Sequence, residues 1–255
     1  MKLIDSHCHL YNEEFAADIE AVVKRAIDSG VEKFFLPAID KSTADSMLAL
    51  EEKYTGKVFS MMGVHPCSIN AAYESELAFA AEWLTKRKFV AIGEIGLDFY
   101  WDKTFTQQQY KAFEIQMQWA LDYNLPIVIH TRNAMQETIE TVKPFAAKGL
   151  RGIFHCFSGT IEDAETIIEM GFLLGIGGVL TYKNSGLQQV IEQIDLNHLV
   201  LETDAPYLTP VPYRGKRNES SYLLLVAEKL AAIKNTTPNE VAATTSANAE
   251  KIFGC

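Results

Sequence analysis

The sequence predicts an α/β protein of the (β/α)8 TIM-barrel type with one extra C-terminal helix. Apolar runs typical of strands alternate with amphipathic stretches typical of helices along all 255 residues. Eight such units in about 250 residues are typical of this barrel. No linker, repeat or low-complexity tract divides the chain, so residues 1–255 are expected to form a single domain.

The expected strands lie near residues 2–9, 32–39, 58–64, 89–95, 126–130, 151–155, 172–179 and 199–203. Most of these runs are almost continuously apolar, which is the pattern of parallel strands covered by helices on both faces. Glycines at 30, 56, 149 and 171 each stand just before a strand, where a short turn out of a helix favours positive φ.

Helical spacing and capping residues fill the intervals between these strands. Apolar residues recur at helical spacing from 19 to 27. Thr106 and Gln109 predict a capping box for a helix reaching about residue 121, and Thr160 is the expected cap of 161–170. The last helix is expected after Thr237 and Pro238, with a capping glutamate following.

The formal net charge of −10 limits the partners of the protein. A protein that binds nucleic acid by bulk attraction usually carries a basic surface. We therefore expect any polyanion to be held locally, by a metal site and a few basic residues. The alternative is that the charge simply keeps the protein in solution.

The ends of the sequence and its cysteines predict a cytoplasmic protein. Met1 and Lys2 lead directly into the first strand without room for a signal peptide, and no apolar run approaches membrane-spanning length. The four cysteines form no C-x-x-C pair and are expected to be reduced thiols.

The first strand carries the clearest chemical signal. Side chains alternate in extended backbone, so Asp5, His7 and His9 share one face. Two imidazoles at this spacing can bind one metal ion, although such a pair taken alone can equally be structural.

Other predicted strands carry metal-binding residue types at the same end. The third strand leads into His65, the fourth carries Glu94, the fifth ends at His130, the sixth ends at His155, and the eighth leads into Asp204. In a parallel barrel these ends lie on one face, where active sites are built. Five of the six histidines lie there, which scattered structural histidines would not explain. The sequence therefore predicts a metal site.

Four histidines and two carboxylates exceed the needs of one tetrahedral ion. They divide into two sites, with His7, His9 and Asp204 at one ion, His130 and His155 at the other, and Glu94 bridging both. Nitrogen and oxygen ligands suit zinc, manganese, cobalt or nickel, and weaker sites admit magnesium. Alternation turns Cys8 and Cys156 away from the neighbouring ligands, so both are interpreted as small buried apolar residues.

Six short stretches contain these residues: 5–10 (DSHCHL), 63–66 (GVHP), 93–98 (GEIGLD), 130–132 (HTR), 155–159 (HCFSG) and 201–208 (LETDAPYL). In this order they resemble the signatures of the TatD family of metal-dependent deoxyribonucleases, within the amidohydrolase-type barrels. The resemblance implies a TIM barrel, a centre of two divalent ions, and hydrolysis of DNA phosphodiesters, often from the 3′ end. It also implies that the metal ligands are the same six residues that the positions of the strand ends indicate.

One segment departs from the family pattern. The family commonly has a proline within two residues of the segment 214–218 (RGKRN), whereas residues 219–221 are ESS in this chain. We expect this difference to affect the loop beside the substrate, and so fine specificity, without affecting the metal centre.

The catalytic residues expected from this arrangement are Asp204 and Glu94. The hypothesis is in-line attack of a water activated between two ions, with Asp204 orienting the water and accepting its proton. Glu202 lies on the same face and is expected to contact a ligand imidazole; the alternative is a solvated carboxylate at the base of the barrel.

Substrate binding is assigned to His65, Arg132, Tyr100, Arg214 and Lys216. His65 is expected to contact a phosphate, as are Arg132 and the basic run 214–217, although that run could be only a solvated group of charges. The aromatic residues 99–101 could stack on an unpaired base or simply wall the barrel mouth.

Two other functions compete with a deoxyribonuclease. One is a related hydrolase acting on an amide, lactone or aminoacyl ester, but many such relatives bridge their metals with a carboxylated lysine, and Glu94 holds that position here. The other is a non-catalytic scaffold, which should have lost ligands, and none is missing. DNA is therefore the expected substrate, with no obligate protein partner and no membrane.

Overall fold

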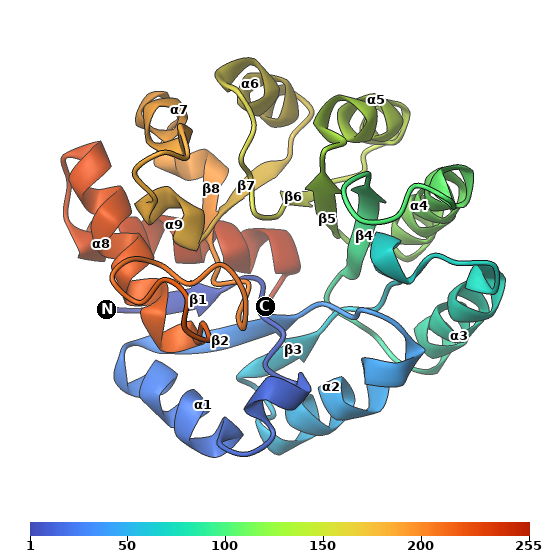
Figure 1. Ribbon diagram of the computed structural model, residues 1–255, viewed down its shortest axis with the longest axis horizontal. Helices are drawn as coiled ribbons and strands as arrows, with labels where there is room; N and C mark the ends of the chain where they lie inside the picture. The colour runs from blue at the N-terminus through green and yellow to red at the C-terminus, as the bar shows by residue number, and fades with distance from the viewer.

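Eight parallel strands form a ring surrounded by helices in the computed structural model, which describes residues Met1–Cys255 (Figure 1). The strands are β1 (Leu3–Asp5), β2 (Val31–Leu36), β3 (Val58–Ser60), β4 (Ile92–Asp98), β5 (Ile127–Arg132), β6 (Gly152–Phe154), β7 (Leu173–Ile176) and β8 (Leu199–Leu201). All eight predicted strands are confirmed. Most of the hydrogen-bonded ladders are shorter than predicted, because the chain leaves the sheet where it reaches the site.

Backbone hydrogen bonds close the ring. The ladders join β1, β2 and β3 in one set and β4 to β8 in another, all parallel and in sequence order. Met62 N–H donates to Ala91 C=O at 3.2 Å beside β3 and β4, and Ser6 N–H donates to Leu201 C=O at 3.0 Å between β1 and β8. The predicted barrel is therefore confirmed.

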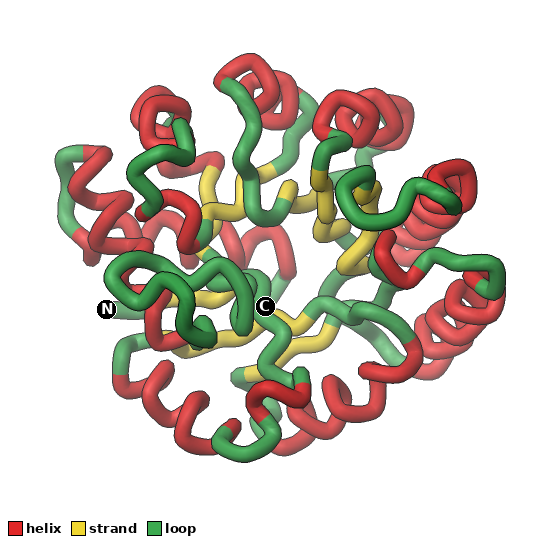
Figure 2. The backbone as a smooth tube through the Cα atoms, viewed as in Figure 1, coloured by secondary structure: helices red, strands yellow, loops and turns green.

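The helices form an outer layer around the strands (Figure 2). They are α1 (Ile19–Asp28), α2 (Lys41–Lys53), α3 (Tyr73–Lys86), α4 (Thr106–Tyr123), α5 (Met135–Ala146), α6 (Ile161–Glu169), α7 (Leu187–Gln193), α8 (Leu223–Lys234) and the additional α9 (Pro238–Phe253). None of them is both long and apolar enough to cross a lipid bilayer. The predicted N-caps Thr160 and Thr237 are confirmed, since each side chain accepts a backbone N–H three residues later.

The capping box predicted at Thr106 is wrong. Phe105 is the N-cap of α4, and the Thr106 hydroxyl donates to Lys103 C=O. Gln109 instead binds the backbone of Asp98, its Oε1 accepting the N–H at 2.9 Å and its Nε2 donating to the C=O at 3.1 Å. Gln109 therefore holds the backbone at the end of β4 in place.

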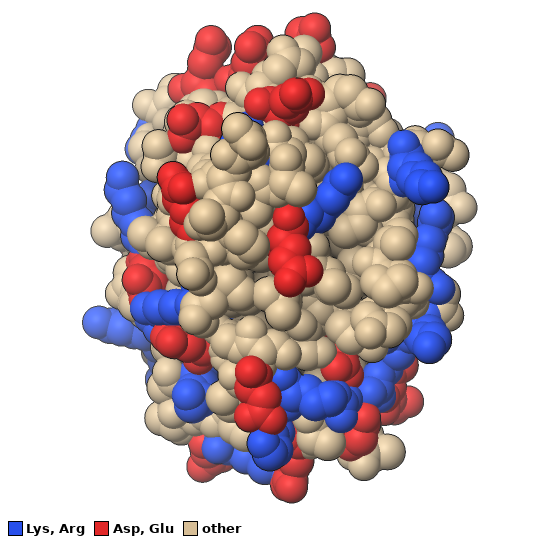
Figure 3. Space-filling model, turned by 90° about the vertical axis from the view of Figure 1, so that its left-hand side faces the viewer, with Lys and Arg blue, Asp and Glu red and all other residues tan.

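Basic side chains do not cover the side of the molecule shown in Figure 3, although several follow one another along its right-hand edge. Lys and Arg side chains lie among Asp and Glu side chains in its lower half. Together with the net charge of −10, this favours local contacts over bulk attraction for any polyanionic substrate.

Helix α9 closes the amino-terminal end of the barrel. An interior layer contains Ile4, Phe35, Met61, Ala91, Val128, Ile153 and Val200 from the strands and their immediate flanks, packed with Ala249 and Phe253 of α9. The Phe253 ring stacks on Phe35 with centroids 4.0 Å apart. Because this layer precedes the predicted ligands along the strands, the metal centre lies above a closed apolar floor.

We predict that Phe253→Ala lowers the free energy of unfolding by about 3 kcal/mol, because it opens a cavity at this floor. Lys251→Ala, on the exposed side of the same helix, should change it by less than about 0.5 kcal/mol. Urea denaturation followed by circular dichroism measures both. Equal effects of the two substitutions would contradict the closing role of Phe253.

Candidate metal centre

The six predicted ligands converge at the carboxyl end of the barrel. His7 and His9 follow β1, Glu94 and His130 lie within β4 and β5, His155 follows β6, and Asp204 follows β8. Glu94 was expected near the end of its strand, but β4 continues to Asp98, so this carboxylate lies deeper in the barrel than predicted.

One oxygen of Glu94 faces the first predicted ion site. Glu94 Oε2 lies 3.2 Å from His7 Nε2 and 3.4 Å from His9 Nε2, and these nitrogens are 3.2 Å apart. Asp204 Oδ1 lies 3.7 and 3.6 Å from the same two nitrogens. Ligand atoms about 2.1 Å from a tetrahedral ion are about 3.4 Å from one another. The four side chains therefore fit around one ion.

The other oxygen of Glu94 faces the second site. Glu94 Oε1 lies 2.9 Å from His130 Nδ1 and 3.1 Å from His155 Nε2. His65 Nε2 is also near, 3.4 Å from the oxygen and 3.2 Å from His130 Nδ1. His65 was assigned to substrate, and this position places it beside the second ion site as well.

Partners on the outer side of the imidazoles set their tautomers. The Tyr11 hydroxyl donates to Pro37 C=O at 2.5 Å, so it accepts from His9 Nδ1, 2.9 Å away. His9 Nε2 then faces Glu94 and Asp204. In a neutral imidazole that carries its proton on Nδ1, Nε2 is the nitrogen that binds metal.

Carboxylates contact the outer nitrogens of the imidazoles at the second site and orient the rings. His130 Nε2 lies 2.9 Å from Asp98 Oδ2, and His155 Nδ1 lies 3.2 Å from Glu202 Oε1. The predicted contact of Glu202 with a candidate ligand imidazole is confirmed. Asp98 was not singled out in the sequence, although it ends the 93–98 stretch.

The surroundings favour an ionised Glu94 carboxylate and a neutral His7 imidazole. Burial acts to raise the pKa of Glu94, but the neighbouring histidines, His155 foremost, outweigh it and hold that pKa well below its ordinary value. Burial lowers the pKa of His7 well below its usual range. Burial also raises the pKa of Asp204 to about 6. A cation placed among these groups offsets the cost of burying the carboxylates.

The position of Asp204 is fixed through hydrogen bonds of the preceding residue, Thr203. Its backbone is left-handed, with φ 54°. Asp5 accepts both the N–H and the hydroxyl of Thr203, at 2.9 and 2.6 Å, and Asn218 Nδ2 donates to Thr203 C=O at 2.7 Å. All three side chains are buried. The sequence analysis assigned no such role to Asp5 or Asn218. Two features could have pointed to it: Asp5 shares a face of the first strand with His7 and His9, and Asn218 ends the 214–218 segment.

The segment that departs from the family pattern anchors this loop. Glu219 accepts two hydrogen bonds from Arg25 of α1, at 2.9 and 2.6 Å. Arg217 makes a bidentate pair with Asp18, both bonds 2.8 Å long. Arg217 is therefore engaged in holding the loop against α1 and is not a free phosphate ligand.

Of the remaining predicted substrate residues, Arg132 ends β5, and Tyr100, Arg214 and Lys216 lie on the loops after β4 and β8. The Arg132 guanidinium lies 3.8 Å from the centre of the Tyr100 ring, and Arg214 lies 4.3 Å from that of Tyr182. The Lys216 ammonium lies 5.7 Å from the centre of the Tyr213 ring. Tyr100 and its neighbour Trp101 are exposed, so they do not simply wall the barrel.

The cysteines stay outside the ligand set. Cys8 is buried, and its Sγ faces Phe35 C=O at 3.8 Å. Cys156 is only partly buried, contrary to expectation, because its N–H binds Glu202 Oε1 and its φ is 48°. Neither belongs to the groups of side chains close enough to hold an ion.

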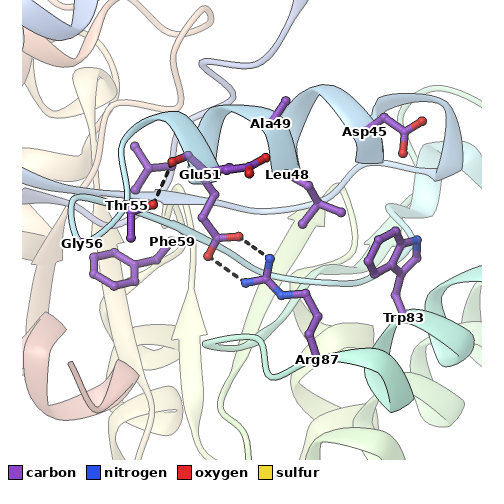
Figure 4. Close-up of a pocket in the computed structure, with 11 residues that line it drawn as sticks. Asp45, Leu48, Ala49, Glu51, Thr55, Gly56, Phe59, Trp83 and Arg87 are labelled. Atoms are coloured by element: carbon purple, nitrogen blue, oxygen red, sulfur yellow. Dashed lines mark hydrogen bonds and ion pairs between the residues drawn. The ribbon is translucent and has the colours of Figure 1, made fainter.

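One surface pocket lies apart from this centre. It has a volume of about 670 Å³ and lies between α2 and α3 (Figure 4). Arg87 crosses it to Glu51, with the two side chains 2.8 Å apart, and Trp83 and Phe59 line it. No candidate metal ligand faces it.

Comparisons with known proteins agree with this geometry. A family model described as TatD related DNase matches residues 4–254. The chain is 38% identical over 252 residues to the uncharacterized metal-dependent hydrolase YabD of Bacillus subtilis, covering 98% of each chain. It is 30% identical over 257 residues to a protein of Erwinia tasmaniensis named 3′-5′ ssDNA/RNA exonuclease TatD, covering 98% of this chain and 99% of the relative.

A solved structure shows the same architecture. The crystal structure of YjjV, a TatD homologue from Escherichia coli, matches with a TM-score of 0.92 and 30% identity, covering 99% of this chain and 98% of that one. Fold and site together define a barrel hydrolase that depends on metal. The chain belongs to the TatD family.

We predict that Glu202→Gln weakens binding of the ion held by His155 by about 10-fold or more, because the carboxylate behind the imidazole loses its charge. Isothermal titration of the metal-free protein with zinc or manganese measures this affinity. Glu228→Gln, exposed on α8, is the matched control and should leave affinity unchanged. Unchanged affinity in Glu202→Gln would show that Glu202 does not support the site.

Proposed function

We propose that this metal-dependent hydrolase is a deoxyribonuclease that removes nucleotides from the 3′ end of DNA, using two divalent ions. The observation that carries the proposal is Glu94, whose two oxygens face two separate sets of imidazoles. The family description and the exonuclease name of the Erwinia relative support the substrate class. The proposal includes a reducing cytoplasmic setting, consistent with four free cysteines, and requires no protein partner.

Two divalent ions, when bound, would activate water and neutralise charge on the leaving oxygen. The side chains of this protein supply the rest. Glu94 is almost fully buried and fixes the relative position of the two ligand sets. The Asp204 side chain is 15% exposed, so it can orient an attacking water from the mouth and accept its proton.

Substrate contacts belong to the same proposal. His65 and Arg132 lie beside the second site and are suited to hold phosphate oxygens. Arg214 and Lys216, on the loop after β8, offer further positive charge, and Tyr100 offers an exposed ring. The proposal that these residues bind DNA accounts for substrate capture by a protein of net charge −10.

Digestion of single-stranded DNA tests the substrate and the direction of attack. With added magnesium, manganese, cobalt, nickel or zinc, 5′-labelled DNA should shorten progressively, and 3′-labelled DNA should release labelled mononucleotide at once. A chelator should abolish both, and adding the ion back should restore them. Failure to cleave DNA with any of the ions, together with chelator-sensitive hydrolysis of amides, lactones or aminoacyl esters, would support the competing hydrolase.

We predict that Asp204→Asn lowers kcat by about 100-fold or more, because the amide cannot accept the proton of the attacking water. Metal content, measured by mass spectrometry on the same samples, shows whether the ions are retained. Asp102→Asn, on the exposed loop after β4, should keep normal turnover. Near-normal turnover of metal-loaded Asp204→Asn would disprove the assignment of the base.

A further inference from the structure

Exposed aromatic rings gather on two loops at the mouth of the barrel. Of the eight large hydrophobic side chains that are exposed, five lie on the loops after β4 and β8, namely Tyr100, Trp101, Tyr207, Val211 and Tyr213. In a ring of eight strands in sequence order, β4 and β8 are opposite one another (Figure 1). The two groups of rings therefore stand on opposite sides of the metal centre.

The rings on the β4 side adjoin the second ion site. Asp98 Oδ1 accepts the backbone N–H groups of Tyr100 and Trp101, at 2.9 and 3.1 Å. The other oxygen of the same carboxylate binds His130 at 2.9 Å. One side chain thus contacts a candidate ligand and fixes the backbone of both aromatic residues.

The ring of Tyr207 on the β8 side adjoins the first ion site. Its centroid lies 6.3 Å from that of His9. Asn218 Nδ2 donates to the C=O of Tyr207 at 2.6 Å as well as to Thr203, the residue before Asp204. Each aromatic group is therefore tied to the metal centre by one buried polar side chain, and the backbone of neither must be ordered when a ligand binds.

We propose that these rings are two nucleobase sites flanking the scissile phosphate, one at Trp101 with Tyr100 and the other at Tyr207. This deepens the proposed nuclease function and rests on it. A phosphodiester lying across the two ion sites directs its two nucleosides toward opposite sides of the mouth, where the rings stand. Arg132, stacked on Tyr100, and Lys216 supply positive charge beside the path. The substrate must then be unpaired on both sides of the bond that is cut.

Abasic oligothymidylates test the two sites separately. One probe lacks the base of the 3′-terminal nucleotide, a second lacks the base of the penultimate nucleotide, and a third is intact. In the wild type each abasic position should lower kcat/KM by about 10-fold. Trp101→Leu should remove the sensitivity at one position only, and Tyr207→Leu at the other position only.

Tyr123→Leu, an exposed aromatic at the end of α4, is the matched control and should keep both sensitivities. Equal cleavage of all three probes by the wild type, or full sensitivity retained in either mouth variant, would overturn the two-site proposal. If the wild type cleaves no probe with any ion, the nuclease function fails instead. Fluorescence anisotropy of the labelled probes then tests the base sites through binding, with the same pattern of losses expected.

Discussion

The structure depends on one buried carboxylate shared by two sets of imidazoles. Glu94 occupies its place because β4 approaches β5 very closely beside it. A Cβ on Gly96, whose φ is 148°, would lie 1.9 Å from His130 C=O, so only glycine permits this approach. With Glu94 in the middle of the strand, four histidines from three other strand ends reach its oxygens. The central position of Glu94 is thus a consequence of the barrel's packing.

Support for this centre comes from the layer of side chains behind the ligands. Glu202 reaches His155 because residue 175 is glycine; a Cβ there would lie 2.2 Å from Glu202 Oε2. At the first site the Tyr11 hydroxyl, which donates to Pro37 C=O, orients the His9 imidazole. These contacts hold the imidazoles in the orientation that metal binding needs. The apolar floor formed with α9 closes the barrel beneath them.

The sequence was sufficient to predict the barrel and the convergence of the six candidate ligands, because both follow from periodicity and strand ends. It was not sufficient for contacts between distant loops. Asp98 and Asn218 carry no local signal of their roles, since their partners lie on other elements. Gln109 illustrates the same limit. Its spacing from Thr106 is that of a capping box, yet its side-chain amide binds the backbone of Asp98 at the end of β4. The N-cap at Thr160 was predictable because its partner, the backbone N–H of Asp163, is only three residues later.

Anomalous diffraction from crystals soaked in zinc or manganese tests the shared bridge most directly. Two peaks should appear at the carboxyl end of the barrel, about 3.5–4 Å apart, one on each side of the Glu94 carboxylate. The first should lie among His7, His9 and Asp204, and the second beside His130 and His155. A single peak at saturating metal, or peaks that do not share Glu94, would contradict the account.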